Sequence, residues 1–280
     1  MNEIPRSFMK SSTRPSRFRI GCVLFFCVGV LSASPVRPSD PGAPAPSATL
    51  GDLLAHARKS VDAFWNQFRS VTCVETVTQE KLGKQGKVEY RQRSSFDYLA
   101  LLNIENNDLL VEESRLQQTS KDKPKNIPLL VTSGLPTLLL VFHPNYQEGF
   151  RYQLEGEEVA GGQKLVKIRF RHVPGARSTT ALRLRNKNYP LEIQGIAWLD
   201  PETGTIHRIA AEIAAPMSDI NLKRLEMDVS YAPCEFPEGI HWLPSAATVD
   251  VQTERQHWHN LHQYSHYKVF MVNTEDKISR

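Results

Sequence analysis

Three segments of this chain alternate apolar with polar residues, and this alternation limits the fold more than any other feature of the sequence. In residues 166–171, 225–231 and 247–252, every second residue is apolar and the residues between are charged or polar. Successive side chains of a strand point to opposite faces of a sheet. Each segment therefore predicts an antiparallel strand with one apolar and one solvated face. The apolar face must be covered by another layer.

Two turn signals predict hairpins. Residues 83–86 begin and end with glycine and follow a run rich in β-branched side chains. The second turn is Asp200–Gly204, where Pro201 presets the backbone and Gly204 tolerates the positive φ that a closing bulge requires. The strands that flank these turns are predicted over 71–78, 88–91, 196–199 and 205–209.

Residues 50–69 repeat apolar side chains at helical spacing. Thr49 can cap this helix, and Asp52 in the first turn interacts favourably with the positive end of the helix dipole. We therefore predict an amphipathic helix with one aromatic-rich face. The residues of that face are Leu50, Leu53, Leu54, Ala57, Val61, Phe64, Trp65 and Phe68.

The most apolar stretch after residue 33 is 127–142. Ser133 or Thr137 can cap a short helix there, with Pro136 near its start and Pro144 ending it. The stretch is shorter than the roughly 20 residues that a membrane-spanning helix needs. It is either core or the lining and lid of a hydrophobic cavity.

Residues 103–126 are polar and include a charged run at 121–125. This composition predicts a mobile loop between the first strands and the apolar stretch. The chain shows no internal repeat and no second linker, so we predict one domain. That domain is α+β, with a long antiparallel sheet, an N-terminal helix and a short apolar helix in the middle.

The N-terminus has the layout of a secretory signal peptide. Five basic residues and one acidic residue in 2–19 precede an uncharged apolar run, 20–31, and the small residues 32–34. We expect cleavage after Ala33, a periplasmic or secreted location, and no membrane span in the mature chain. The predicted organisation is a signal peptide over 1–33, a disordered Pro/Ala/Ser-rich tether over 34–48, a single domain over 49–273 and a C-terminal tail over 274–280.

Removal of the leader changes the charge balance. The whole chain has 34 basic and 30 acidic residues. Subtracting the five basic residues and one acidic residue of the leader leaves 29 of each sign in the mature chain. Nucleic-acid-binding domains usually carry a strong basic excess, so nucleic acid is not an expected partner.

Two cysteines, Cys22 and Cys27, lie in the apolar core of the leader, and no convincing lipid-attachment motif surrounds them. The mature chain retains Cys73 and Cys234. In an oxidising compartment these two are candidates for a disulfide. The alternative is two separate buried thiols.

The sequence lacks the short motifs of common enzymes. It has no G-x-S-x-G elbow, no H-E-x-x-H pair, no glycine-rich phosphate loop and no C-x-x-C. We therefore predict a binding protein rather than an enzyme, with no catalytic residue, no cofactor and no resident metal.

Histidines and basic residues form two further patterns. In a strand, His257 and His259 point to the same side and can both reach one ion, with His262 and His266 following. The alternative is a solvated sheet face. Likewise Lys167, Arg169 and Arg171, together with Arg183 and Arg185, either dock anionic headgroups or form the solvated face of their strand.

The order of these segments resembles the periplasmic lipoprotein-carrier superfamily, which includes the LolA and LolB carriers and the RseB-like stress sensors. The resemblance rests on the leader, the tether, the N-terminal helix, the Trp198–Gly204 hairpin sequence WLDPETG and the late strand containing Tyr264–Tyr267. It extends over most of residues 49–272 and is nearest to uncharacterised secreted relatives. The resemblance implies an open, strongly curved half-barrel of antiparallel strands whose concave face is covered by helices.

The resemblance also implies that the protein shields an acyl chain or another hydrophobic group from water. We therefore predict a hydrophobic ligand, a lipid or a lipoprotein acyl chain, in a half-barrel cavity. The candidate ligand-binding residues are Leu138, Leu139, Val141, Phe142, Phe150 and Trp198. The alternative is a protein-interaction or stress-sensor module on the same scaffold, which recognises an envelope protein through a sheet edge or the 103–126 loop and holds no small ligand.

Overall fold

The computed structural model describes residues 48–69, 71–105, 108–118, 134–184 and 187–269. All of them belong to one compact unit, Pro46–Arg280. The signal peptide, nearly all of the tether and the C-terminal tail lie outside the described residues, so the domain boundaries stay predictions.

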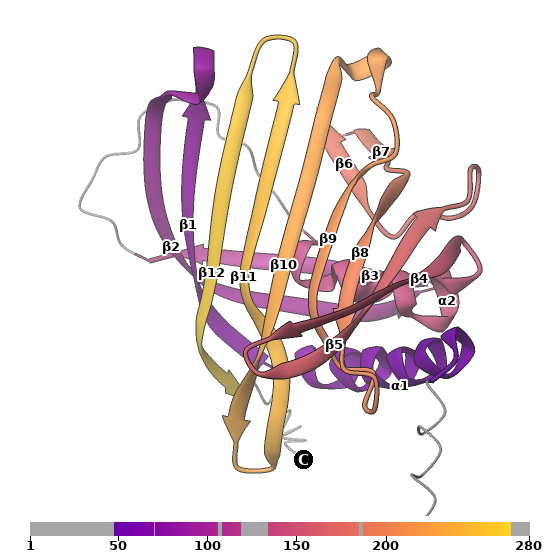
Figure 1. The fold of residues 1–280 in the computed structure, drawn as a ribbon. Helices are drawn as coiled ribbons and strands as arrows, with labels where there is room; N and C mark the ends of the chain where they lie inside the picture. The colour runs from indigo at the N-terminus through magenta and orange to yellow at the C-terminus, as the bar shows by residue number, and fades with distance from the viewer. Residues whose placement is uncertain (1–47, 70, 106–107, 119–133, 185–186, 270–280) are drawn as a thin grey trace, which may run out of the picture. The chain divides into compact units, whose positions relative to one another are not determined.

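Ten of the described strands form one antiparallel sheet (Figure 1) in the order β3-β2-β1-β12-β11-β10-β9-β8-β5-β4, and β6 and β7 form a separate pair. The strands are β1 (Val71–Leu82), β2 (Val88–Glu105), β3 (Asp108–Gln117), β4 (Phe150–Ala160), β5 (Gln163–His172), β6 (Ala181–Leu184), β7 (Lys187–Pro190), β8 (Ile193–Leu199), β9 (Ile206–Ile213), β10 (Leu222–Phe236), β11 (Gly239–Thr253) and β12 (His257–Val269). A large antiparallel sheet with few helices is therefore confirmed. Its curvature into a half-barrel stays a prediction.

The first and last described strands along the chain, β1 and β12, are neighbours in the sheet. β1 pairs with β12 over nearly its full length, for example Val77 with His262. Strands β2 and β3 continue outward from β1, so the unit β1–β3 joins the rest of the sheet through β12. The described sheet thus depends on pairing between its two sequence ends.

The predicted alternation and turns are confirmed. In β5 the apolar residues Val166, Ile168 and Phe170 are buried, whereas Arg169 and Arg171 are exposed. The first hairpin turn contains a short 3₁₀ helix, η1 (Lys84–Gly86). In the second turn Gly204 has a φ of +72°, and a Cβ atom there would lie 2.2 Å from the backbone of His56. Glycine is therefore needed both for the turn and for the close approach of the N-terminal helix.

The loop predicted over 103–126 is wrong in its first part. β2 continues to Glu105, and β3 occupies Asp108–Gln117 as its antiparallel partner. Hydrophobic periodicity does not predict this strand, because its partly buried positions include Glu113 and Arg115 rather than apolar residues alone. Residues 119–133, which include the charged run, lie outside the described residues.

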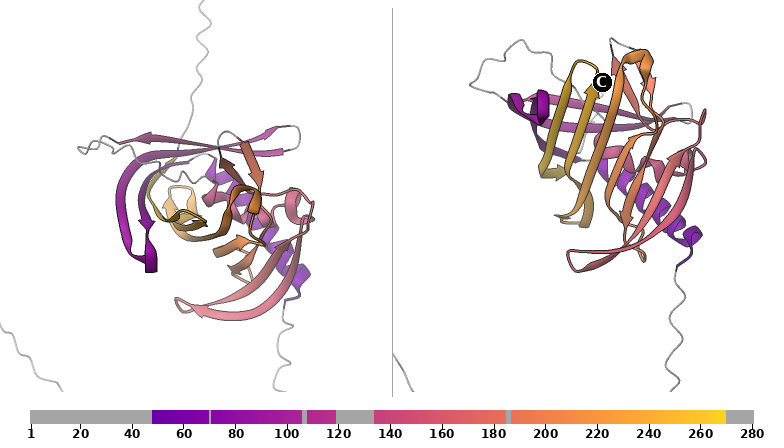
Figure 2. Two further views of the ribbon diagram at one scale, coloured as in Figure 1. Left: turned by 90° about the horizontal axis from the view of Figure 1, so that it is seen from above. Right: turned by 45° about the horizontal axis from the view of Figure 1, so that its top comes forward.

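The N-terminal helix α1 spans Leu50–Phe68, one residue shorter than predicted. The hydroxyl of Thr49 accepts the N–H of Asp52, and the carboxylate of Asp52 accepts the N–H of Thr49. This reciprocal capping box satisfies two backbone donors that the helix start leaves open. α1 runs across the strands (Figures 1 and 2), and the ring of Phe64 meets that of Tyr231 edge-on at 5.9 Å.

The apolar stretch contains a 3₁₀ helix, η2 (Leu135–Phe142), followed by one short α-helix, α2 (Pro144–Gln147). A short helix in this stretch was predicted, and the structure shows that it is of the 3₁₀ type. Gly134, with a φ of +75°, is the residue before the first turn, so Thr137 is not the cap, and Ser133 lies outside the described residues. Pro136 lies in the first turn and Pro144 begins α2 directly after His143, so η2 is bounded by residues that prevent a longer α-helix.

A third short 3₁₀ helix, η3 (Ser218–Ile220), joins β9 to β10. Within the described ranges, no helix is both long and apolar enough to cross a membrane.

Candidate functional site

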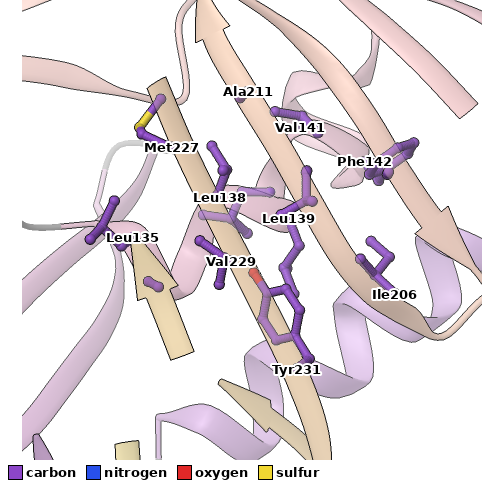
Figure 3. Packing of buried hydrophobic residues seen from close by; sticks show 14 of the residues in the cluster. Leu135, Leu138, Leu139, Val141, Phe142, Ile206, Ala211, Met227, Val229 and Tyr231 are labelled. Atoms are coloured by element: carbon purple, nitrogen blue, oxygen red, sulfur yellow. The ribbon is translucent and has the colours of Figure 1, made fainter. Parts of the chain in front are cut away.

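The 3₁₀ helix η2 lies at the centre of the apolar packing (Figure 3). Every residue of η2 is buried, and Val141 and Phe142 are 0% exposed. The ring of Phe142 lies 6.1 Å from that of Phe170 in β5. Burying a large apolar side chain contributes about 1.5–3 kcal/mol. Hydrophobic burial therefore accounts for the position of η2 inside the domain.

Three hydrogen bonds fix the backbone of η2 and the glycine before it. The hydroxyl of Tyr231 donates to the carbonyl of Pro136 at 3.0 Å, and the hydroxyl of Tyr152 donates to the carbonyl of Val141. The N–H of Gly134 donates to the carboxylate of Glu113 at 2.6 Å. Burial raises the pKa of both tyrosines, which keeps their hydroxyls protonated and able to donate.

A pocket of about 310 Å³, which we call the α1 pocket, lies between α1 and the sheet. Its size falls at the lower end of the range of about 300–1,000 Å³ that ligand pockets occupy. Apolar side chains of α1, η2, β9, β10 and β11 line it, and hydroxyl and amide groups accompany one charged residue, Lys59. The apolar lining residues are Val61, Ala63, Phe64, Leu139, Ile206, Tyr231, Ile240 and Trp242.

Ile240 marks the solvent side of this pocket. Its side chain lines the pocket although the residue is 64% exposed. Tyr231 and Leu139, by contrast, are 5% and 3% exposed and form the inner wall, where Figure 3 shows them side by side. The pocket therefore leads from an exposed apolar residue to the surface of the buried helix η2.

The structure brings five of the six predicted ligand-binding residues together. Leu138, Leu139, Val141, Phe142 and Phe150 all belong to the buried apolar cluster. Leu139 lines the pocket, whereas the other four pack behind it in the core.

Trp198 is the sixth predicted residue, and it lies on the opposite face of the sheet. Its neighbours in β8, Ala197 and Leu199, are buried, whereas Trp198 itself is partly exposed. The indole N–H donates to Glu158 at 3.0 Å, and the guanidinium of Arg208 lies 4.6 Å from the ring centre. Trp198 is therefore not part of the α1 pocket.

A buried ionic cluster lies on β1, β3 and β12, and the sequence analysis had singled out only one of its residues, His262. The carboxylate of Glu75, 0% exposed, accepts hydrogen bonds from Arg115 and contacts Nδ1 of His262 at 2.8 Å. Arg115 also pairs with Glu113 at 2.7 Å. Burial alone would raise the pKa of Glu75, but the hydrogen bonds from His262 and Arg115 outweigh burial and lower it.

Cys73 and Cys234, the candidates for a disulfide, are both free in the structure. Cys73 is buried and Cys234 is partly exposed. Burial raises the pKa of Cys73 to about 12 and also raises the pKa of Cys234. The thiolate, which is the reactive form, is therefore disfavoured at both positions.

The four histidines considered as metal ligands all belong to β12, but they do not lie on one face of that strand. His257 and His259 face outward, where each contacts the carboxylate of Asp250, at 2.9 and 3.6 Å. His262 faces inward to Glu75, and His266 is exposed at a position with a φ of +55°. No group of three or more potential ligands suited to a metal ion occurs in the part of the chain that the structure describes.

The basic residues of β5 are partly neutralised by the neighbouring strand. Lys167 pairs with Glu158 at 3.5 Å, and Arg169 pairs with Glu155. The interpretation as a solvated strand face therefore fits these two residues. Of the other residues in this pattern, the side chain of Arg183 and all of Arg185 lie outside the described part.

Sequence reasoning missed most of the pocket lining because its residues come from separate elements. Val61 and Phe64 were identified as one stripe of α1, but their partners on the sheet were not. Ile240 and Trp242 alternate directly after a Pro-Glu-Gly turn, and that alternation was the available signal. Their approach to α1 depends on sheet pairing that no local pattern encodes.

No protein-family model and no curated protein matches the sequence. Among solved structures, a DUF1329 family protein from Desulfovibrio piger is similar with a TM-score of 0.42 and 9% identity, over 79% of this chain and 92% of that chain. A LolA superfamily protein from Nitrosomonas europaea has a TM-score of 0.39 and 9% identity, over 78% and 94%. A putative outer membrane lipoprotein-sorting protein domain from Vibrio parahaemolyticus has a TM-score of 0.40 and 12% identity, over 80% and 94%. Two of these structures are described as a LolA superfamily protein and a lipoprotein-sorting protein domain, which is the class of protein that the sequence resembles.

Proposed function

We propose that this protein binds the hydrocarbon chain of a lipid or of a lipoprotein in the α1 pocket, outside the cytoplasm. The observation that carries the proposal is a pocket of about 310 Å³ whose inner wall is apolar and whose outer side meets the exposed Ile240. The predicted leader supports the location. In this proposal the sheet is an open half-barrel, and α1 and η2 cover its concave face.

Binding in such a site comes mainly from burial of apolar ligand surface, at about 0.8 kcal/mol for each methylene. Lys59, the one charged residue among the lining residues of this pocket, suits a polar or anionic group left in solvent. A longer chain would reach Leu138, Val141, Phe142 and Phe150 only after η2 shifts, because the first three are buried residues of η2 and Phe150 packs in the same cluster.

The first test is native mass spectrometry of the chain secreted by a bacterial host and purified without detergent. A bound mass that dissociates on activation and extracts into organic solvent supports the proposal. A protein that is free of ligand, and that also fails to bind an added fluorescent C16 fatty acid, contradicts the proposal and favours the envelope-protein module.

A matched pair of variants tests the position of the site. Ala63→Trp places an indole in the pocket from the exposed side of α1, whereas Ala55→Trp adds the same group to an exposed position of α1 outside the pocket. We expect Ala63→Trp to weaken fatty-acid binding about tenfold, which corresponds to about 1.4 kcal/mol. Equal binding by both variants would place the ligand elsewhere.

A further inference from the structure

The outward face of the sheet carries a row of carboxylates across three neighbouring strands. Glu212 in β9 lies directly opposite Glu226 in β10, and Glu226 lies directly opposite Asp250 in β11. Directly opposite side chains have Cβ atoms about 4.5–5.5 Å apart, and like charges at such positions are destabilising. This carboxylate row is therefore unfavourable for the protein by itself.

Other carboxylates on this face are paired with residues of opposite charge. Asp228, one row away, accepts hydrogen bonds from Arg208, and Glu158 pairs with Lys167. The carboxylate row has one guanidinium, Arg224, which bonds Glu226. The charges of Asp250 and Glu212 also raise the pKa of Arg224, although its hydrogen bond to Glu226 is the larger cause. Three carboxylates thus share one arginine.

The partners of the two outer carboxylates are not lysine or arginine. Glu212 accepts the side-chain amide of Gln194 at 3.0 Å, and Asp250 contacts His257 and His259. Among the described residues, no lysine or arginine pairs with either carboxylate. Against the one guanidinium of Arg224, the three carboxylates leave about two negative charges that no lysine or arginine of the described residues balances.

The row borders a groove of about 530 Å³, which is larger than the α1 pocket. In the adjacent row, Ala210 and Thr248 have short side chains that leave space beside the carboxylates. Trp198 and Arg169 also line the groove; Trp198 is partly exposed, and Arg169 is exposed and pairs with Glu155 of β4. Uncompensated charge therefore coincides with accessible volume on the face opposite the α1 pocket.

We propose that this groove docks an extended basic segment of a partner protein. Neighbouring strands lie about 4.8 Å apart, so Glu212 and Asp250 are about 10 Å apart across the sheet. In an extended peptide, side chains on the same side repeat every 6.6–7 Å or so, and the long stems of lysine and arginine cover the remaining distance. Two such residues, two positions apart, reach both outer carboxylates.

A partner with several charges fits this groove better than a single ion. The described side chains include no group of three ligands suited to hold a metal, whereas the carboxylates are spread in a line over three strands. A linear cation matches a linear row. This docking surface is independent of the proposed lipid pocket.

The test measures fluorescence anisotropy of a labelled hexalysine peptide with the whole secreted protein at low ionic strength, with a hexaserine peptide as the neutral probe. The variant Glu212→Gln with Asp250→Asn removes two charges from the row. The control, Glu202→Gln with Glu238→Gln, removes two charges from exposed turns outside the groove. We expect hexalysine binding about tenfold weaker in the row variant and nearly unchanged in the control.

A second variant tests the space rather than the charge alone. Thr248→Lys puts a cationic side chain into the groove, and Asn66→Lys puts the same side chain on the exposed surface of α1. Thr248→Lys should abolish hexalysine binding, and Asn66→Lys should retain it. The row variant should also melt no lower than the wild type, because it removes like-charge repulsion. Equal weakening by row and control variants, or binding of hexaserine, would overturn the proposal.

Discussion

The inner side of the sheet is built in two different ways. On β5, β8, β9 and β10, apolar side chains such as Ile168, Ile193, Ile209 and Val229 are fully buried and belong to one cluster with η2. On β1, β3 and β12, the buried and partly buried positions include the ionic cluster of Glu75, Glu113, Arg115 and His262. One sheet therefore combines an apolar half with an ionic half.

The two halves contribute differently to the fold. Apolar burial is non-directional and supplies most of the free energy of folding. A buried ion pair gains little on balance, because desolvation of both charges offsets their attraction. The ionic cluster does, however, define positions: Glu113 holds the N–H of Gly134 immediately before η2. We infer that the apolar half supplies stability and that the ionic half places the edge strand and the start of η2.

The largest expected effect is the removal of one ionic partner. Arg115→Met leaves Glu75 and Glu113 buried without their guanidinium, which should lower the free energy of unfolding by about 3–5 kcal/mol. Urea denaturation measures the change. The matched control replaces Glu75→Gln, Glu113→Gln and Arg115→Met together, which removes the charges but keeps acceptors, and it should recover much of the loss. A triple variant as unstable as the single one would show that the cluster contributes net stability.

A cavity in the apolar half should cost somewhat less. Leu138 is 1% exposed in the apolar cluster, so Leu138→Ala should lower the free energy of unfolding by about 2–5 kcal/mol. Leu154→Ala serves as the control, because Leu154 is 45% exposed on β4. The same denaturation experiment applies. Similar losses for both variants would mean that η2 is not held by burial.

The smallest effect is a pH dependence confined to the ionic half. The pKa of Glu75 is lowered from its usual value of 4.5. The stabilisation from its ionised form is therefore complete above pH 4.5 and is lost as the pH falls through the lowered pKa. The stability difference between wild type and Glu75→Gln should be constant from pH 7 to about 5 and shrink below 4.5. A difference that grows in acid would contradict the assignment.

The apolar half is also the half that the sequence predicts well. Alternation located β5, β10 and β11, and helical spacing located α1 with its Thr49 cap, because each pattern repeats over several residues. The six proposed ligand-binding residues were taken from apolar character alone. That criterion identified the η2 cluster, but it cannot tell on which face of β8 Trp198 lies, because residues 196–199 are all apolar and show no alternation.

The ionic half and the outer row escaped prediction for a common physical reason. Glu75, Glu113 and Arg115 are single polar residues in strands, and each becomes meaningful only when pairing brings it beside a residue far along the chain. The row formed by Glu212, Glu226 and Asp250 likewise depends on the register of three strands. Register is a property of the assembled sheet, so no local sequence window contains it.

The pairing of β1 with β12 has a consequence for how the domain forms. The contact between Glu75 and His262 joins residues 187 positions apart. Closing so large a loop carries an entropic cost before any contact rewards it, and topologies dominated by such contacts fold slowly. The unit β1–β3 cannot attach to the rest of the sheet until the last strand has been synthesised. The sheet of such a chain therefore stays incomplete throughout translation. This late completion of the fold suits a polypeptide whose predicted leader directs it across a membrane before it folds.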